Sequence, residues 1–299
     1  APDQHLPQWP LRELARRGVR SAAFLGSMWP WSWPYANLRN HRKVMIVDGK
    51  LGFTGGMNIR GGCLDAAAPH LRTHDVHFSL EGPVVAQLVD AFAEDWAFST
   101  GEDLADAAWF PPLAAVGDSP ARVVPDGPDE DLDKLRFVLL GALAEAQERI
   151  AIVTPYFLPD AALQAALVVA ARRGVQVDIV LPAESNLRFV QWASTAELWL
   201  LLHHGCNVWL TPPPFDHSKL FIIDHAWSCI GSTNWDPRSL RLNFELNVEV
   251  YDRELARRIA QEVDLRIAKA TRYTEADHHA RSYATRVRDG LARLLSPYL

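Results

Sequence analysis

The chain has 299 residues, of which 48% are hydrophobic and 22% charged, a composition typical of folded globular proteins rather than disordered or fibrous ones. Its formal net charge of −6 argues against nucleic acid as a partner, because general binding of nucleic acid usually requires a basic surface. No apolar run is long enough to cross a bilayer, and three widely spaced cysteines (Cys63, Cys206 and Cys229) suggest free thiols in a reducing compartment rather than disulfides.

The chain begins with a helical pattern at residues 11–18, followed by an apolar stretch at 19–25 that predicts a strand. Residues 28–34 read MWPWSWP, with tryptophans at positions 29, 31 and 33. Indole rings suit a membrane interface, so this segment is either a lipid-facing loop or a tryptophan-rich loop packed on the protein.

Residues 95–120 break the periodicity and contain Pro, Gly and Ser, which is typical of a connection. We therefore expect a first half, residues 1–120, and a second half, residues 121–299. The second half begins with alternating strand and helix patterns, and its tail from residue 252 has a long, charge-rich helical pattern. This βαβαβ rhythm predicts a mostly parallel sheet with helices on both faces. The predicted strands are 150–157, 175–181 and 207–210, and the predicted helices are 160–174 and 196–204.

Two segments, 41–58 (HRKVMIVDGKLGFTGGMN) and 217–234 (HSKLFIIDHAWSCIGSTN), align without a gap. Each contains a short apolar run, 44–47 or 220–223, that predicts a buried strand, and a later glycine suited to a turn or a close backbone approach. The shared positions are His41 and His217, Lys43 and Lys219, Asp48 and Asp224, Gly55 and Gly231, and Asn58 and Asn234.

The first copy lacks most of the strand–helix alternation that precedes the second copy. Only residues 11–18 and 19–25 correspond to the last helix and strand before the second motif. We therefore expect the sequence to begin inside the first half; the alternative is a first half that is naturally reduced.

A His-x-Lys sequence on a strand directs both side chains to one face, because residues two apart point the same way. Two such copies that face each other would bring two imidazoles and two ammoniums to one phosphodiester. One imidazole could attack phosphorus while the other protonates the leaving oxygen, and the lysines could neutralise the phosphate. A single His-x-Lys is usually surface decoration, but two gapless copies favour a duplicated site over an inactive repeat.

No metal-binding or cofactor-binding motif occurs in the sequence: there is no Cys/His cluster, EF-hand loop, HExxH or Gly-rich phosphate loop. The lysines supply positive charge that a metal would otherwise provide. We therefore expect catalysis without a metal or other cofactor, and full activity in excess EDTA.

The two motifs resemble the signature of the phospholipase D superfamily, His-x-Lys-x4-Asp followed by a Gly and an Asn. Further segments resemble cardiolipin synthases, namely AIVTPYFLPD at 151–160, GVQVDIVLP at 174–182, NWDPRSLRLNFE at 234–245 and RDGLARLLSPYL at 288–299. The resemblance implies an α/β fold of two repeats, each a mostly parallel sheet flanked by helices. A pseudo-twofold axis would relate them, with the active site between them. It also implies association with the bacterial inner membrane, through an amino-terminal part that this sequence lacks.

The resemblance further implies a role for each motif residue. His41 would be the nucleophile and His217 the general acid, an order that the near-symmetry makes reversible. An acidic residue on the following strand would orient each histidine, Asp75 for His41 and Glu245 for His217. Two pairs of residues, Lys43 with Lys219 and Asn58 with Asn234, would hold the phosphate. The motif carboxylates, Asp48 and Asp224, are expected mainly to tie loops together.

The leading functional prediction is transfer of a phosphatidyl group from phosphatidylglycerol to a second phospholipid alcohol through a phosphohistidine. A hydrolase acting on phospholipid or another phosphodiester is the alternative enzyme, with a nuclease disfavoured by the acidic charge. A membrane-binding scaffold with a relic site is the non-enzymatic alternative.

Overall fold

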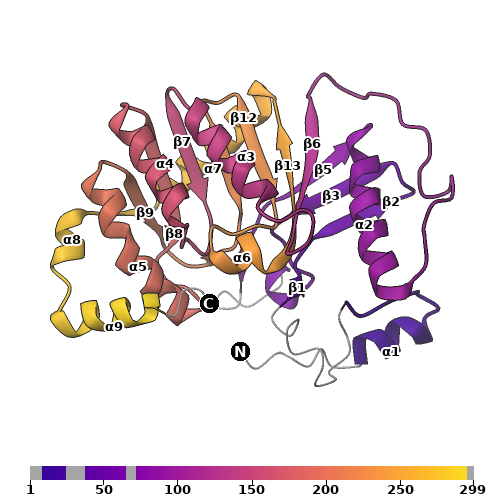
Figure 1. Cartoon of the computed structure of the whole chain (residues 1–299), viewed down its shortest axis with the longest axis horizontal. Helices are drawn as coiled ribbons and strands as arrows, with labels where there is room; N and C mark the ends of the chain where they lie inside the picture. The colour runs from indigo at the N-terminus through magenta and orange to yellow at the C-terminus, as the bar shows by residue number, and fades with distance from the viewer. Residues whose placement is uncertain (1–8, 25–37, 65–71, 295–299) are drawn as a thin grey trace.

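A computed structural model describes residues 9–24, 38–64 and 72–294 (Figure 1). The tryptophan-rich segment at 28–34 lies outside these residues. The elements in chain order are α1 (Trp9–Arg16), β1 (Arg39–Asn40), β2 (Val44–Val47), β3 (Leu51–Gly55), η2 (Gly61–Cys63), β4 (Thr73–His74), β5 (His77–Glu81), α2 (Val84–Thr100), β6 (Ala121–Asp126), α3 (Lys134–Glu145), β7 (Arg149–Val153), α4 (Ala161–Arg172), β8 (Gln176–Pro182), α5 (Arg188–His203), β9 (Asn207–Thr211), β10 (Phe215–Asp216), β11 (Leu220–Ile223), β12 (Trp227–Gly231), α6 (Pro237–Arg241), β13 (Asn243–Val250), α7 (Arg253–Ile267), β14 (Thr271–Tyr273), α8 (Glu275–His279) and α9 (Tyr283–Leu294).

The largest sheet has the strand order β1-β13-β12-β11-β7-β8-β9-β14, with β6 also paired to β13. Its parallel part is β7, β8 and β9, connected by α4 and α5, which is the βαβαβ unit expected from the sequence. The strands of the second motif extend this unit in antiparallel fashion through β11, β12 and β13. The α/β class is confirmed, and the sheet is mixed.

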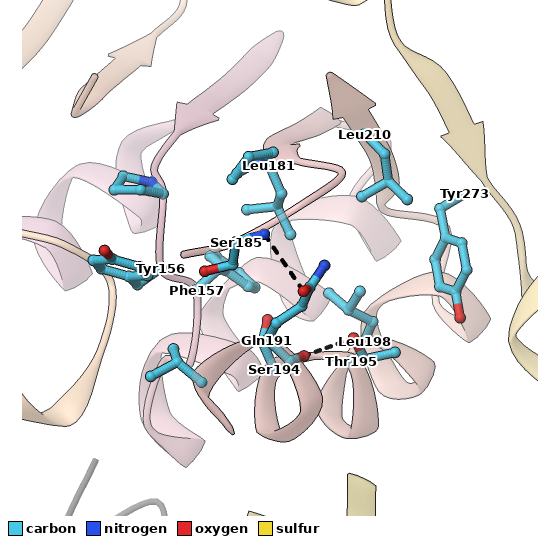
Figure 2. A pocket seen from close by; sticks show the side chains of 13 residues that line it. Tyr156, Phe157, Leu181, Ser185, Gln191, Ser194, Thr195, Leu198, Leu210 and Tyr273 are labelled. Atoms are coloured by element: carbon cyan, nitrogen blue, oxygen red, sulfur yellow. Dashed lines mark hydrogen bonds between the residues drawn. The ribbon is translucent and has the colours of Figure 1, made fainter. Parts of the chain in front are cut away.

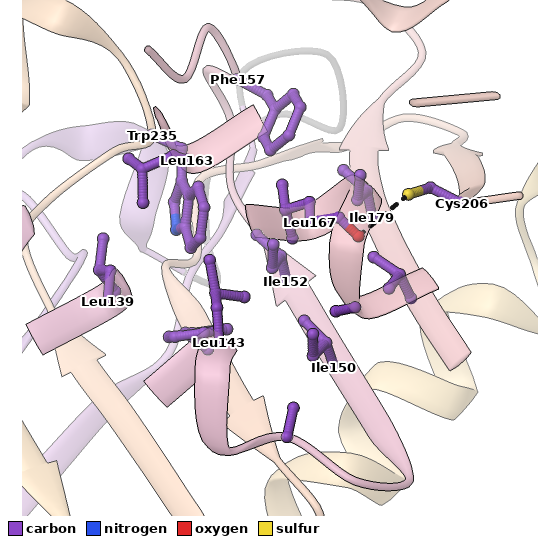
Figure 3. Packing of buried hydrophobic residues seen from close by; sticks show 14 of the residues in the cluster. Leu139, Leu143, Ile150, Ile152, Phe157, Leu163, Leu167, Ile179, Cys206 and Trp235 are labelled. Carbon is purple, nitrogen blue, oxygen red and sulfur yellow. Dashed lines mark hydrogen bonds between the residues drawn. The ribbon is translucent and has the colours of Figure 1, made fainter. Parts of the chain in front are cut away.

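Helices cover both faces of this sheet because its strands are apolar on both sides. Strand β7 illustrates the alternation: Ile150 and Ile152 pack with α3, α4 and α5, whereas Ala151 and Val153 pack with α7 and α2. Figure 3 shows the first cluster, in which leucines of α3 and α4 meet the isoleucines of β7. These two apolar layers fix the strand ends, and the motif residues lie at those ends.

The first half forms a smaller antiparallel sheet, β2-β3-β5, covered by α2. It departs from the expected parallel sheet because its described residues include counterparts of β11, β12 and β13 but not of β7, β8 and β9. Two short parallel pairs join the halves: β1 pairs with β13, and β4 pairs with β10. Each half therefore contributes a strand to a partner in the other half.

Several element boundaries differ from the predictions. Residues 19–24 do not form the predicted strand; instead the ring of Phe24 packs against Phe98 and Phe244. Helix α2 continues to Thr100, so the connection begins only at residue 101. Helix α5 begins eight residues earlier than expected, and the tail divides into α7, β14, α8 and α9. Asp160 caps α4 as predicted. Across the described residues, no helix combines the length and the apolar character needed to traverse a bilayer.

Candidate active site

The first motif histidine is held by the second half of the chain. His41 directly follows β1, and its backbone N–H donates to the carbonyl of Phe244 at 2.8 Å. Its ring Nδ1 lies 2.8 and 3.0 Å from the two carboxylate oxygens of Glu245, which is fully buried. Ser232 and Asn243 donate to the same carboxylate, at 2.5 and 3.1 Å, and so fix its orientation. His41 is thereby set at one rotamer with Nδ1 occupied.

The second motif histidine is held by the first half in the same way. His217 follows β10, and its backbone N–H donates to the carbonyl of His74 at 2.7 Å. Its Nδ1 lies 2.9 Å from a carboxylate oxygen of Asp75, which is 2% exposed. The other Asp75 oxygen accepts the backbone N–H of Val76 at 2.8 Å. The two histidine sites thus repeat each other in backbone and side-chain contacts.

The predicted pairing of each histidine with the acid of its own half is therefore wrong. Within the second half, β12 lies between β11 and β13, so His217 and Glu245 sit two strand spacings apart, about 10 Å. The parallel pair β1–β13 instead matches residue 40 with 244, and one further step brings His41 opposite Glu245. The pair β10–β4 does the same for His217 and Asp75.

The two motif lysines lie in the same buried space. Lys43 Nζ donates to the His41 carbonyl at 2.8 Å, and Lys219 Nζ donates to the His217 carbonyl at 2.6 Å. Burial lowers the pKa of Lys43 to about 8 and that of Lys219 to about 7. The negative charges of Asp75 and Glu245 raise both pKa values and so offset part of this effect. The charge of Lys43 also lowers the pKa of Lys219. Each lysine therefore senses acids from both halves, which supports one shared site.

With Nδ1 bonded to a carboxylate, Nε2 is the ring nitrogen that each histidine can use for chemistry, and in His217 this atom also lies 3.1 Å from Lys219 Nζ. His41 is the more open ring, with its side chain 27% exposed, against 10% for His217. Burial is the main cause that lowers the pKa of His217, and the hydrogen bond to Asp75 counteracts it. Lys219 Nζ lies 3.0 and 3.1 Å from the ring nitrogens of His217 and also favours its neutral form. The arrangement provides two oriented imidazoles beside two cations, as phosphoryl transfer needs.

The two motif aspartates share a backbone conformation but differ in their contacts. Asp48 and Asp224 have positive φ angles of 54° and 52° at the turns that follow β2 and β11. The Asp224 carboxylate accepts the backbone N–H groups of residues 147, 148 and 149, each at 2.8 Å. Asp48 is exposed, and its carboxylate accepts no hydrogen bond from the part of the chain that is described. The contacts of Asp224 thus match a loop-tying role.

The motif glycines lie where two backbones approach closely. A Cβ on Gly55 would lie 2.5 Å from the Val76 carbonyl oxygen, and one on Gly231 would lie 2.5 Å from the Asn247 side chain. This confirms the close approach predicted from the sequence. The two asparagines end their motifs differently: Asn58 is half-buried, whereas Asn234 is buried and donates to Ser239 at 3.1 Å.

Sequence reasoning missed several side chains around the histidines. Burial is the main cause that raises the pKa of Asp126 to about 7 and that of Asp236 to about 6, and the charge of Glu245 raises both further. The ring of Tyr156 meets the His217 ring edge-on, with centroids 6.4 Å apart. Ser232 could have been noticed, because it directly follows the motif glycine.

An open pocket lies between the ends of the parallel strands and α5 (Figure 2). Tyr156 lines this pocket and also contacts His217, so the pocket adjoins the second histidine. Gln191 spans part of it and accepts from the Ser185 backbone at 3.4 Å. Among the described residues, no group of three or more His, Cys, Asp or Glu side chains is placed to hold a metal ion.

Comparisons with known proteins indicate what the chain is similar to. The family profile "Cardiolipin synthase, PLD-like domain" matches residues 139–266. Cardiolipin synthase 2 of Staphylococcus epidermidis is 32% identical over 97% of this chain and 60% of its own length. Cardiolipin synthase of Oceanobacillus iheyensis is also 32% identical, over 97% of this chain and 60% of its own. The chain therefore spans about 60% of the length of these relatives.

A solved structure, the phosphatidylserine synthase of Haemophilus influenzae, shares the fold. It has a TM-score of 0.66 at 15% identity, over 87% of this chain and 71% of that one. By sequence, residues 139–266 match a phospholipase D-like domain and the chain as a whole is similar to bacterial cardiolipin synthases, while its fold is shared with the Haemophilus synthase.

Proposed function

We propose that the chain carries the catalytic site of a cardiolipin synthase-like phosphatidyltransferase that works at a membrane. The substrate is a phospholipid, with phosphatidylglycerol as the donor. The observation that carries the proposal is the exchange of acids between halves: Glu245 orients His41, and Asp75 orients His217. Both Nδ1 atoms are thereby engaged, so that each Nε2 can serve one phosphodiester beside Lys43 and Lys219.

In the first step, the Nε2 of one histidine attacks the phosphorus of phosphatidylglycerol. The bond to the glycerol oxygen breaks, and the second histidine gives that oxygen its proton, so glycerol leaves and a phosphatidyl-histidine remains. In the second step, the second histidine takes a proton from a headgroup hydroxyl of another phosphatidylglycerol. That oxygen attacks phosphorus, which releases cardiolipin and frees the first histidine.

Either histidine could be the nucleophile, and one argument supports each of them. The family resemblance assigns the nucleophile to His41, which is also the more exposed ring. The lowered pKa of His217 keeps that ring neutral at neutral pH, and a nucleophile must be neutral. Mass spectrometry of a trapped intermediate, with the sample kept free of acid, identifies the nucleophile, because the modified peptide contains either residue 41 or residue 217.

The proposal is tested with phosphatidylglycerol vesicles and separation of the products. Cardiolipin plus glycerol is expected, and His41→Ala and His217→Ala should each abolish it while circular dichroism stays unchanged. His203→Ala removes an exposed histidine on α5 and should keep full activity. Substantial turnover in either motif variant would mean that the two histidines do not serve one reaction.

Hydrolysis is the alternative outcome of the same assay, because water can replace the acceptor alcohol in the second step. Phosphatidic acid without cardiolipin would identify a phospholipase D-type hydrolase. No turnover of any phosphodiester would favour a membrane-binding scaffold.

A further inference from the structure

Helix α9 has an apolar face that points away from the protein. Its residues Tyr283, Val287, Leu291 and Leu294 are 80%, 43%, 60% and 73% exposed. They are spaced by four, four and three residues, so they form one stripe along the helix. The opposite side of α9 is the packed one, because Asp289 and Ala292 are buried there and the helix contacts α5.

Arginines flank this stripe on both sides. On a helical projection, Arg288 lies along one border, and Arg286 and Arg293 lie along the other. The only acidic residue of α9 is Asp289, which is buried and paired with Arg281 and Arg288. Arg293 pairs with Glu197 of α5 at 2.9 Å. Among the ion pairs of the described residues, Arg286 is therefore the one arginine of α9 without a carboxylate partner, and it places positive charge beside the apolar stripe on a chain whose net charge is −6.

The stripe continues toward the candidate active site through the start of α5. The Arg288 guanidinium lies 4.3 Å from the ring centroid of Trp192, and Phe189 packs edge-on against the same indole. Phe189 is 56% exposed. Figure 1 shows α9 along the lower edge of the molecule, where β1 and α6, which adjoin the two motifs, also lie. In this view α9 therefore lies on the same side of the molecule as β1 and α6.

We propose that α9 lies in the interface of an anionic phospholipid membrane, with its apolar stripe among the acyl chains and its arginines at the headgroups. This rests on the proposed function in one respect, namely that the substrate is a lipid of that membrane. Apolar burial and attraction to anionic headgroups act together in such helices. A second copy of the chain is a poorer partner, because a symmetric contact through α9 would bring the arginines of both copies together.

The test measures binding of the chain to sedimented vesicles of phosphatidylglycerol and phosphatidylcholine. The variant pair Val287→Glu with Leu291→Glu should weaken binding roughly tenfold or more, because two apolar contacts are replaced by charges. The control pair is Val169→Glu with Leu265→Glu, at positions 54% and 57% exposed on α4 and α7, and should bind like the unaltered chain. Added salt should weaken binding as well.

Equal binding by the α9 pair and the control pair would overturn the proposal, as would a lack of binding by the unaltered chain. Gel filtration with light scattering adds a further check: a dimer that only the α9 pair dissociates would identify α9 as a contact between copies and would also overturn it. Turnover of a short-chain, monomeric phosphatidylglycerol should persist in the α9 pair. If neither the unaltered chain nor the α9 pair turns over this short-chain lipid, but vesicle binding still depends on α9, the proposed function fails and the membrane inference stands.

Discussion

The exchange of acids between the halves can be tested through Asp75. Asp75→Asn removes a negative charge from a side chain that is 2% exposed and lies 2.9 Å from His217 Nδ1. A hydrogen bond to a charged group contributes about 1.5–3 kcal/mol. If that stabilisation is lost in the transition state, kcat falls about 10- to 150-fold. The exposed Asp90→Asn on α2 is the matched control and should keep full activity.

The pH dependence of Asp75→Asn has a defined sign. Asp75 raises the pKa of His217 through its hydrogen bond and its charge, so the variant lowers that pKa further. The limb of the pH–rate profile that reports His217 must therefore move to lower pH, whether this ring acts as the acid or as the nucleophile.

The ¹⁵N signals of the histidine rings locate the effect. The alanine variants His41→Ala and His217→Ala assign the two signals. Asp75→Asn should then shift the signals of His217, and Glu245→Gln should shift those of His41. The reverse pattern, or a limb displaced to higher pH, would refute the exchanged pairing.

Two further predictions concern the lysines and the motif aspartates. Because the pKa values of Lys43 and Lys219 are about 8 and 7, both ammoniums are present below pH 7 and are lost as the pH rises past 8. The KM for an anionic phosphodiester should accordingly rise across that window, and a KM that stays constant from about pH 6 to 9 would contradict it. Asp224→Ala should lower the free energy of unfolding in urea by about 3 kcal/mol, because three backbone N–H groups lose their acceptor. Asp48→Ala should cost only about 1 kcal/mol, from placing alanine at a positive φ, and equal costs for the two variants would disprove this contrast.

The βαβαβ unit and the positions of the motif residues could be predicted from the sequence because their signals are local. The apolar run at 220–223 is flanked by a histidine and an aspartate, and β11 covers those same four residues. Asp160 directly precedes the helix that it caps. The strand predicted at residues 19–24 does not form, because a strand also needs a neighbouring strand to pair with, and an apolar pattern does not supply one.

The exchange of acids could not be predicted in this way. Both candidate acids follow their motifs at similar distances, so the sequence favours pairing within each half. The actual choice depends on β1 and β4, two-residue strands that are too short to leave a periodic pattern. Asp126 likewise approaches Glu245 only because β6 lies beside β13, a pairing between distant segments of the second half that leaves no local pattern.

The exchanged strands have a consequence for how the chain acquires activity. Neither half contains a complete histidine–carboxylate pair, so a folded half on its own should be inert, however stable it is. Cleavage within residues 101–120 would leave two fragments whose turnover reports their mutual affinity, since dilution would separate the proton donors from their acids. Catalytic competence in this molecule is therefore a measure of association between its two parts.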